Sequence, residues 1–163
     1  MQIRRATADD ARPLLDIYAP FVKDSTISFE LTPPTLETFA ERIENSLRTH
    51  EWLVMKDGER YCGYAYGTPH RTREAYRFSV ETSVYVSVDY RGKGVGKKLY
   101  YALFESLQTL GYKSALAGIT MPNPASIALH TAVGFEKVGV YKDVGRKFGD
   151  WHDVSWWQRS LSA

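Results

Sequence analysis

The order of hydrophobic and polar positions predicts alternating strands and helices. Period-two alternation indicates half-buried strands, and apolar spacings of three and four indicate one face of a helix. The pattern predicts strands over residues 2–5, 52–55, 61–67, 77–88, 114–121, 135–141 and 153–159. It predicts helices that begin after Thr7, after Thr35, at the end of the stretch 91–97, and after Asn123. The order β-α-α-β-β-β-α-β-α-β-β indicates an α/β fold.

The strand and helix on either side of residues 91–97 have the most regular patterns. Val84, Val86 and Val88 alternate, which predicts that they share a buried strand face. The apolar residues of the next helix share one helical face: Leu99, Tyr100, Leu103, Phe104, Leu107 and Leu110. Gly111 is expected to end this helix as the residue after its cap.

Capping and turn residues predict several boundaries. Thr7 is expected to cap the first helix, and Asn123 with Pro124 is typical of a helix start. Asp57-Gly58 predicts the turn of a hairpin, and residues 145–149 are expected to connect the last two strands.

The connection Arg91-Gly92-Lys93-Gly94-Val95-Gly96-Lys97 lies between strand and helix. Its glycines leave backbone N–H groups uncovered at a helix start, where the helix dipole favours negative charge. The pattern therefore predicts a phosphate or pyrophosphate site. The glycine spacing does not fit the dinucleotide-binding motif Gly-x-Gly-x-x-Gly. It also does not fit a P-loop, which needs glycine where Arg91 stands.

Composition narrows the class of protein. The length of 163 residues predicts a single domain spanning residues 1–163, and a net charge of +2 does not indicate a nucleic-acid partner. No apolar run predicts a membrane span, and the charged N-terminus does not resemble a secretory signal. The single cysteine, Cys62, excludes an internal disulfide framework and favours a cytoplasmic location.

The motif Arg-x-x-Gly-x-Gly, directly after a Tyr-Val strand, resembles the acetyl-CoA loop of the GNAT family of N-acetyltransferases. The order of elements matches that family along the entire chain, which implies a mixed α+β sheet. The phosphinothricin and methionine sulfone/sulfoximine N-acetyltransferases are similar to this chain in several further short sequence motifs. These are Ser25-Thr26-Ile27-Ser28-Phe29, the segment 81–87, Leu129-His130, Gly134-Phe135 and the segment 149–154.

The resemblance implies that acetyl-CoA is the co-substrate and that no metal is needed. In this family, the corresponding asparagine contacts the pantetheine arm, and Val84 and Val86 would offer it backbone N–H and C=O groups. The implied residues for binding acetyl-CoA are Val84, Tyr85, Val86, Arg91, Gly92, Lys93, Gly94, Val95, Gly96, Lys97, Asn123 and Ser126.

Two residues are candidates for proton transfer. Glu81 is an isolated acid in a predicted strand, where burial among apolar residues would suit a general base; the alternative is a strand glutamate that faces water or an arginine. His130 stands where many relatives have a tyrosine that protonates the departing thiolate. An imidazole can supply that proton near neutrality, and the alternative is a hydrogen-bonded helix histidine.

Besides Glu81, which is also a candidate for binding the acceptor, four further residues are candidates for this role. By resemblance, Arg71, Arg73 and Tyr76 would surround an amino acid, whereas a solvated basic loop is the alternative. Phe29 is either a wall of that pocket or an apolar plug over the core. His152 and Asp153 suggest a dyad, but because no nucleophile accompanies them they are interpreted as structural.

The sequence thus predicts an N-acetyltransferase that acts on phosphinothricin, methionine sulfoximine or methionine sulfone by direct attack in a ternary complex. Alternatives are a different amine, such as a polyamine, an aminoglycoside or a protein N-terminus, and a non-catalytic acyl-CoA-binding module. Retention of both Glu81 and His130 argues against that module. The aromatic segment 151–157 predicts a homodimer.

Overall fold

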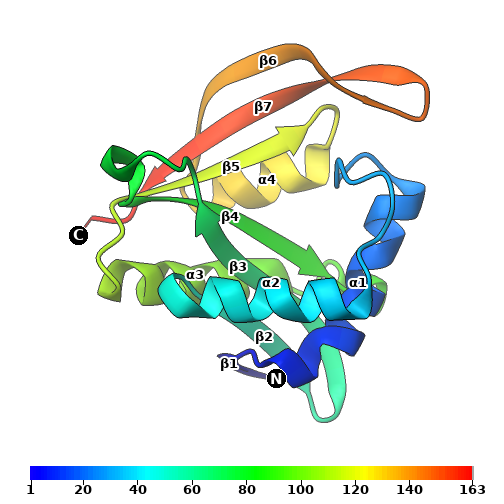
Figure 1. Cartoon of the computed structure of the whole chain (residues 1–163), viewed down its shortest axis with the longest axis vertical. Coiled ribbons are helices and arrows are strands. Elements are labelled where there is room, and N and C mark those ends of the chain that lie inside the picture. The colour runs from blue at the N-terminus through cyan, green and yellow to red at the C-terminus, as the bar shows by residue number, and fades with distance from the viewer. Residues whose placement is uncertain (163) are drawn as a thin grey trace.

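The computed structural model describes residues 1–162 and contains one seven-stranded sheet in the order β1-β2-β3-β4-β5-β7-β6 (Figure 1). The strands are β1 Gln2–Arg5, β2 Trp52–Asp57, β3 Arg60–Pro69, β4 Ser79–Val86, β5 Ser114–Thr120, β6 Glu136–Lys147 and β7 Asp150–Ser160. The helices are α1 Ala11–Asp24, α2 Leu36–Thr49, α3 Val95–Thr109 and α4 Pro124–Ala132. Three short 3-10 helices are η1 Ala8–Asp10, η2 Glu74–Tyr76 and η3 Val88–Tyr90. This arrangement confirms the predicted element order.

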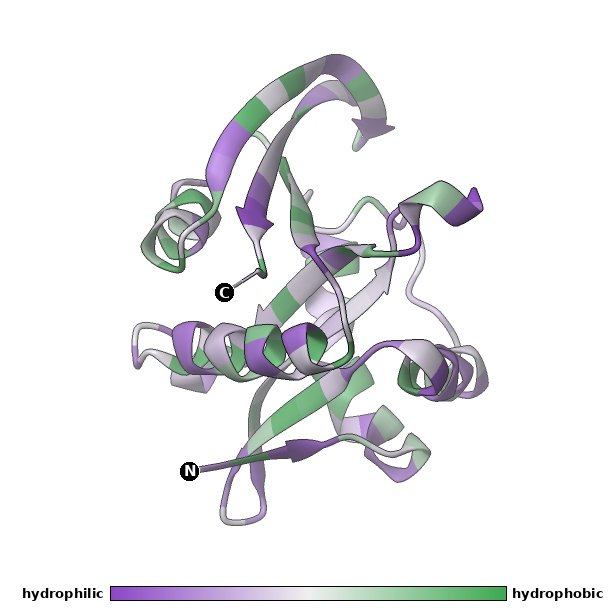
Figure 2. Ribbon diagram, turned by 90° about the vertical axis from the view of Figure 1, so that its left-hand side faces the viewer, coloured by the Kyte–Doolittle hydropathy of each residue, from purple (hydrophilic) through white to green (hydrophobic). Residues whose placement is uncertain are grey.

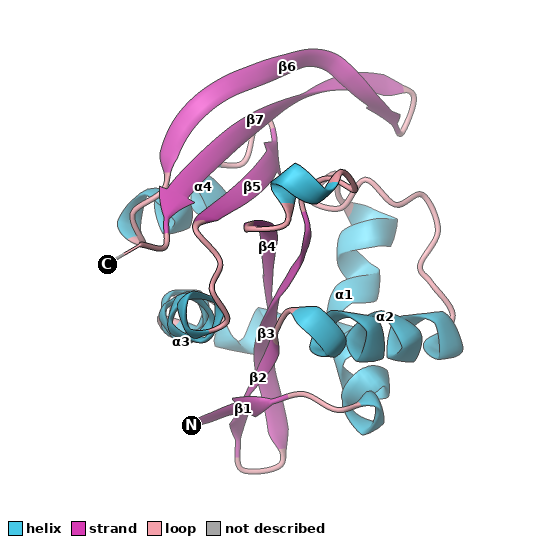
Figure 3. Ribbon diagram, turned by 60° about the vertical axis from the view of Figure 1, so that its left-hand side comes forward, coloured by secondary structure: helices cyan, strands magenta, loops and turns pink. Residues whose placement is uncertain are grey.

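Helices cover both faces of the sheet. Figure 3 shows α3 on one side of strands β2 to β4, and α1 with α2 on the other side. Each face has its own core cluster: Leu99, Leu103 and Leu107 of α3 are buried on one face, and Leu14 and Ile43 are buried on the other. The strands between these clusters are covered on both faces, and residues 52–55 of β2 are all buried. Figure 2 shows hydrophobic stretches, in green, among these central strands.

The sheet opens between β4 and β5. All other neighbouring strands pair antiparallel, whereas β4 and β5 are parallel and pair only from Ser79 with Ser114 to Glu81 with Leu116. Beyond Glu81, the two strands diverge in Figure 1. Strand β4 nevertheless stays paired with β3 as far as Val86. One edge of β4 therefore lacks a partner strand from residue 82 onward.

Several predicted boundaries are confirmed. Thr35 caps α2 by accepting a hydrogen bond from the Thr38 N–H, and Asn123 caps α4 by accepting one from the Ser126 N–H. Pro124 opens α4, and Gly111 follows α3 with a positive φ of 96°. These features depend on residues within one helical turn, which is why the sequence predicts them.

Other boundaries were predicted wrongly. The strand predicted over residues 77–88 is shorter, because Val88 belongs to η3 and is 70% exposed. Leu110, which was placed on the buried helix face, caps α3 and is exposed. Gly145 lies within β6 rather than in the connection, because the two final strands form a longer hairpin that turns at Phe148 and Gly149.

The hairpin β6–β7 arches away from the other strands and reaches the connection between α1 and α2 (Figure 1). Lys147 fixes this contact: its side chain is buried, and Nζ donates hydrogen bonds of 2.7 Å to the carbonyl oxygens of Val22 and Ser28. An ammonium group at the last turn of α1 is also favoured by the helix dipole.

Candidate active site

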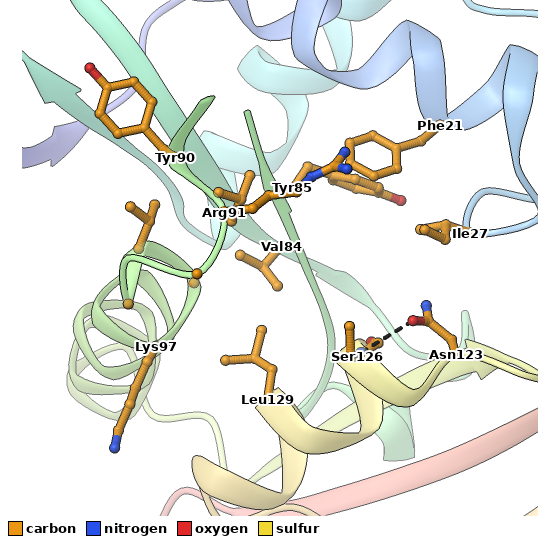
Figure 4. A pocket seen from close by; sticks show the side chains of 16 residues that line it. Phe21, Ile27, Val84, Tyr85, Tyr90, Arg91, Lys97, Asn123, Ser126 and Leu129 are labelled. Atoms are coloured by element: carbon orange, nitrogen blue, oxygen red, sulfur yellow. Dashed lines mark hydrogen bonds between the residues drawn. The ribbon is translucent and has the colours of Figure 1, made fainter. Parts of the chain in front are cut away.

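A cavity of about 410 Å³ lies between the start of α3, the start of α4 and strand β4 (Figure 4). Eleven of the twelve residues predicted to bind acetyl-CoA line it: Val84, Tyr85, Val86, Arg91, Gly92, Gly94, Val95, Gly96, Lys97, Asn123 and Ser126. Lys93 is the exception, and its ammonium lies over the Tyr90 ring. The ammonium of Lys97 extends away from the other labelled side chains in Figure 4.

The glycines of residues 91–97 have two different structural roles. Gly92 and Gly94 have φ values of 73° and 77°, in the left-handed region that side chains disfavour. Gly96 is helical, and a Cβ there would lie 3.0 Å from the Leu129 side chain, so it allows α3 and α4 to approach each other. The first N–H groups of α3 therefore face the cavity without side chains over them, as an anion site requires.

The unpaired edge of β4 also borders the cavity. The Ser87 N–H donates to the Cys62 carbonyl, which fixes the hydrogen-bonding phase between β3 and β4. Because hydrogen-bonded positions alternate along an antiparallel pair, the backbone groups of Val84 and Val86 point to the other edge. Their side chains are half-buried and line the cavity.

A second, smaller cavity of about 60 Å³ occupies the opening between β4 and β5. It shares Val84, Asn123 and Ser126 with the larger cavity, so the two adjoin. Tyr100 and His130 line its inner end. The opening thus connects the face of the sheet that holds α3 and α4 with the opposite face.

His130 has protein partners at both ring nitrogens. Nδ1 lies 2.7 Å from the Ser126 carbonyl oxygen, which can only accept, so Nδ1 carries a proton. Nε2 lies 2.8 Å from the Tyr100 hydroxyl and accepts its hydrogen bond. Burial lowers the pKa of His130, and the hydrogen bond to Ser126 opposes this shift only in part. His130 is therefore a neutral, hydrogen-bonded helix histidine.

Glu81 lies on the opposite face of β4 from Val84, because side chains alternate along a strand. Its side chain is 30% exposed, so the expected burial among apolar residues is wrong. Oε2 lies 3.3 Å from Nδ1 of His70, which follows β3. Glu81 is the last residue of β4 that pairs with β5, so the opening between these two strands begins there.

Aromatic side chains surround Glu81 and His70 on this face. The rings of Tyr76 and Trp156 lie 5.9 Å and 6.2 Å from the His70 ring, both nearly perpendicular to it. Gly118 of β5 leaves space for the Trp156 ring, which a Cβ there would meet at 3.3 Å. Of the residues predicted to bind the acceptor, Tyr76 packs against His70, which in turn hydrogen-bonds to Glu81.

The other predicted acceptor residues lie further out. Arg71 and Arg73 are exposed and form no ion pair within residues 1–162, although Arg71 donates to the His70 carbonyl. Phe29 belongs to neither core cluster and lines neither cavity. Its ring fills the space beside Gly145 and lies 6.2 Å from the His152 ring.

The connection that carries Phe29 is held from three elements. The Tyr18 hydroxyl of α1 lies 2.7 Å from Ser28 Oγ and donates to Glu30. Arg42 of α2 forms a bidentate ion pair with Glu30, which lowers the pKa of that carboxyl. Lys147 of β6 binds the Ser28 carbonyl. Ile27, in the same connection, lines both cavities.

Sequence reasoning missed several residues that line the larger cavity: Phe21, Ile27, Tyr90, Ala125 and Leu129. Ala125, Ser126 and Leu129 share one helical face, so the spacing from Ser126 could have identified Leu129. Phe21 and Ile27 come from α1 and the connection after it, and no local pattern connects them with residues 91–97.

Within residues 1–162, no group of three or more His, Cys, Asp or Glu side chains could hold a metal ion, and no helix could span a membrane.

Comparison with known proteins gives a consistent result. The family model described as an acetyltransferase (GNAT) domain matches residues 3–156. A phosphinothricin N-acetyltransferase of Streptomyces coelicolor is 38% identical, over 99% of this chain and 96% of that protein. An L-methionine sulfoximine/L-methionine sulfone acetyltransferase of Pseudomonas aeruginosa is also 38% identical, over 98% of this chain and 94% of that protein.

Two solved structures are similar throughout. A GNAT superfamily phosphinothricin acetyltransferase from Sinorhizobium meliloti, in complex with AcCoA, has a TM-score of 0.94 and 38% identity over 99% of this chain and 88% of that chain. A ribosomal-protein-alanine N-acetyltransferase from Brucella melitensis has a TM-score of 0.95 and 38% identity over 98% of this chain and 99% of that chain.

Proposed function

The chain belongs to the GNAT family of acetyltransferases, and from this premise we propose that it acetylates the amino group of a small amino-acid analogue. Phosphinothricin, methionine sulfoximine and methionine sulfone are the proposed acceptors, because relatives that align over nearly the whole chain are named for them. The observation that carries the proposal is the opening between β4 and β5, which adjoins the larger cavity and begins at Glu81.

The larger cavity is proposed to bind acetyl-CoA, which supplies the acetyl group as a thioester. Its residues fit this molecule: the N–H groups at the start of α3 would bind the pyrophosphate, with Arg91 adding charge. The free backbone edge at Val84 and Val86 would pair with the amide groups of the pantetheine arm, as an added strand would. Asn123, which caps α4 at the cavity, would contact the same arm.

Glu81 is proposed to accept the proton of the acceptor ammonium group. The amine nitrogen then forms a bond to the thioester carbonyl carbon. As the carbon–sulfur bond breaks, the remaining extra proton of the nitrogen passes to the departing sulfur, so the leaving group is released as the free thiol and Glu81 returns its proton to solvent. Glu81 lies at the start of the opening, on the face of β4 opposite Val84 and Val86, so the acceptor amine would approach the opening from that face and the thioester from the larger cavity. This arrangement favours direct attack in a ternary complex.

His130 is proposed to orient Tyr100 at the inner end of the smaller cavity. Of the two roles considered from the sequence, the geometry favours the hydrogen-bonded histidine, because neither ring nitrogen is free to transfer a proton to a thiolate. A neutral imidazole whose N–H already binds a carbonyl is also a weak acid.

The acceptor pocket is proposed to lie among Glu81, Tyr76 and Phe29. Arg71 and Arg73 lie on the same loop as His70 and form no ion pair within residues 1–162, so they would bind the carboxylate or oxyanion of the acceptor. These arginines disfavour polycations such as polyamines.

Release of free thiol from acetyl-CoA with a panel of amines tests this proposal. Phosphinothricin, methionine sulfoximine and methionine sulfone should give the highest kcat/KM values. The panel should include a peptide with N-terminal alanine, because the ribosomal-protein-alanine N-acetyltransferase from Brucella melitensis is equally similar to this chain. A polyamine and an aminoglycoside complete it. Higher kcat/KM for the peptide would redirect the proposal, and turnover with no amine would favour a binding module.

A homodimer is also proposed. The hairpin β6–β7 exposes five large apolar side chains: Val138, Tyr141, Val144, Phe148 and Trp151. Such a group is typical of a protein interface. Light scattering at micromolar concentration should give twice the mass of the chain, and Trp151→Asp should shift it to one chain, whereas Val88→Asp, on η3, should not. A wild-type protein with the mass of one chain and full activity would exclude the dimer.

The proposed location is the cytoplasm, consistent with a free, buried Cys62.

A further inference from the structure

His70 has an unusual position among the residues that follow β3. Arg71, Arg73 and Glu74 in the same loop are exposed, but only 13% of the His70 side chain is exposed. The pairing of Thr68 with Glu81 and of Pro69 with Val80 brings this loop alongside β4. His70 thus reaches the Glu81 carboxylate from a neighbouring strand, and within residues 1–162 it is the side chain that hydrogen-bonds to it.

The His70 ring has a fixed orientation. Tyr76 from η2 and Trp156 from β7 both contact it edge to face, at interplanar angles of 73° and 72°. Arg71 further anchors the backbone by donating to the His70 carbonyl oxygen at 3.1 Å. A ring held on two sides keeps Nδ1 directed at Glu81, at a distance of 3.3 Å.

The hydrogen bond makes the two oxygens of Glu81 unequal. A carboxylate only accepts, so Nδ1 of His70 carries the proton and donates to Oε2. Oε1 has no hydrogen-bond partner within residues 1–162, and so it is the oxygen open to an incoming ammonium group. Nε2 of His70 also has no protein partner within these residues. This atom is not buried, so it reaches solvent.

We propose that His70 is a positioning residue that holds Glu81 in the rotamer in which Oε1 meets the acceptor amine. This inference rests on the proposed role of Glu81 as proton acceptor. A glutamate has three rotatable side-chain bonds and is partly exposed here, so without a partner its carboxylate would sample several orientations. Holding the base in one orientation favours proton transfer when the amine attacks.

Two substitutions separate the hydrogen bond from the ring. His70→Leu removes the donor, and kcat with the best amine should fall roughly 10- to 100-fold, as expected when a hydrogen bond to a charged group is lost. His70→Asn keeps an N–H donor near the position of Nδ1, and it should restore most of the kcat. Acetyl-CoA affinity, measured by calorimetry, should stay unchanged in both. His50→Leu, at the end of α2 and stacked on Tyr112, is the matched control and should leave kcat unchanged.

A double-mutant cycle with Glu81→Gln distinguishes positioning from a general structural effect. If His70 acts through Glu81, His70→Leu should cause no further loss of kcat in the Glu81→Gln protein. An equal loss in both backgrounds, or a His70→Leu enzyme with normal kcat, would overturn the proposal while leaving the role of Glu81 intact. A Glu81→Gln enzyme with normal kcat would instead overturn the proposed base, and the role of His70 with it.

Discussion

The hydroxyl of Tyr100 lies 2.8 Å from Nε2 of His130, and both side chains are buried between α3 and α4. Thr82 of β4 reaches the same hydroxyl at 3.3 Å, so three elements meet at the inner end of the smaller cavity. The contact links the position of α4, which begins with Asn123, to the strand that borders both cavities.

If His130 acts by holding Tyr100, the reduction in kcat caused by removing His130 should not depend on the leaving group. His130→Ala should reduce kcat by the same factor for acetyl-CoA and for an acyl donor whose thiol leaves easily as an anion. Pre-steady-state kinetics must first show that chemistry limits turnover. A loss that disappears with the better leaving group would identify His130 as the proton donor. Tyr100→Phe should cost about 1–3 kcal/mol in the free energy of unfolding, because it leaves buried Nε2 unpaired.

His130 should also make the protein less stable in mild acid. Burial lowers its pKa below the ordinary value of 6.5, so as the pH falls below about 6.5 the unfolded chain takes up a proton that the native protein refuses. The free energy of unfolding should therefore decrease with falling pH in that range. Burial lowers the pKa of His50 in the same direction. Urea denaturation at several pH values should show a shallower decrease in His130→Asn, and a shallower one still in the double variant with His50→Asn.

Glu81→Gln tests the proposed base directly. It should keep the affinity for acetyl-CoA and lower kcat by roughly 10²–10⁴-fold, the usual range for general-base catalysis. The loss should shrink as the pH rises, because more of the acceptor amine is then already deprotonated. If Glu81 only orients the ammonium group, the change should appear mainly in KM. Near-normal kcat across the pH range would exclude proton acceptance by Glu81.

Gly94→Asp should abolish binding of acetyl-CoA. A Cβ at Gly94 would meet no protein atom within 4 Å, so the expected loss comes from a negative charge at the anion site and not from a clash. Gly58→Asp is a matched control, because its φ of 59° is also left-handed and its Cβ would also meet no atom within 4 Å. Calorimetry should show loss of binding only in Gly94→Asp, and equal affinity in both folded variants would remove the basis for the cofactor site.

Lys147→Met should release the connection that carries Ile27. The free energy of unfolding should fall by about 2–3 kcal/mol, the usual cost of removing hydrogen bonds to a charged group. KM for the amine should rise as well, because Lys147 binds the Ser28 carbonyl next to Ile27, which lines the opening. Lys142→Met on the same hairpin removes only an exposed ion pair with Asp153 and should change both quantities far less. Similar changes in the two variants would show that the buried contacts of Lys147 do not hold the loop.

The sequence by itself determined the features that depend on neighbouring residues. Hydrophobic period, caps and glycine spacing act within one or two turns, and so the element order, the helix start at Thr35 and the cap at Asn123 were predicted correctly. The connection predicted over residues 91–97 is shorter, because α3 already begins at Val95. The alternation at Val84 and Val86 was also confirmed, although these side chains line a cavity as well as packing against the core cluster on the α3 face. Periodicity indicates an apolar face without indicating what covers it.

Only the tertiary structure decided which distant residues meet. Lys147 binds carbonyl oxygens 125 and 119 residues earlier in the chain, and Tyr100 meets His130 across 30 residues. The exposure of Glu81 and its contact with His70 follow from the register of β3 on β4, which no local pattern specifies. The opening between β4 and β5 likewise follows from a strand pairing that ends at Glu81, which no local pattern specifies. The sequence could therefore identify the candidate residues, but their partners and orientation are set by packing over the whole fold.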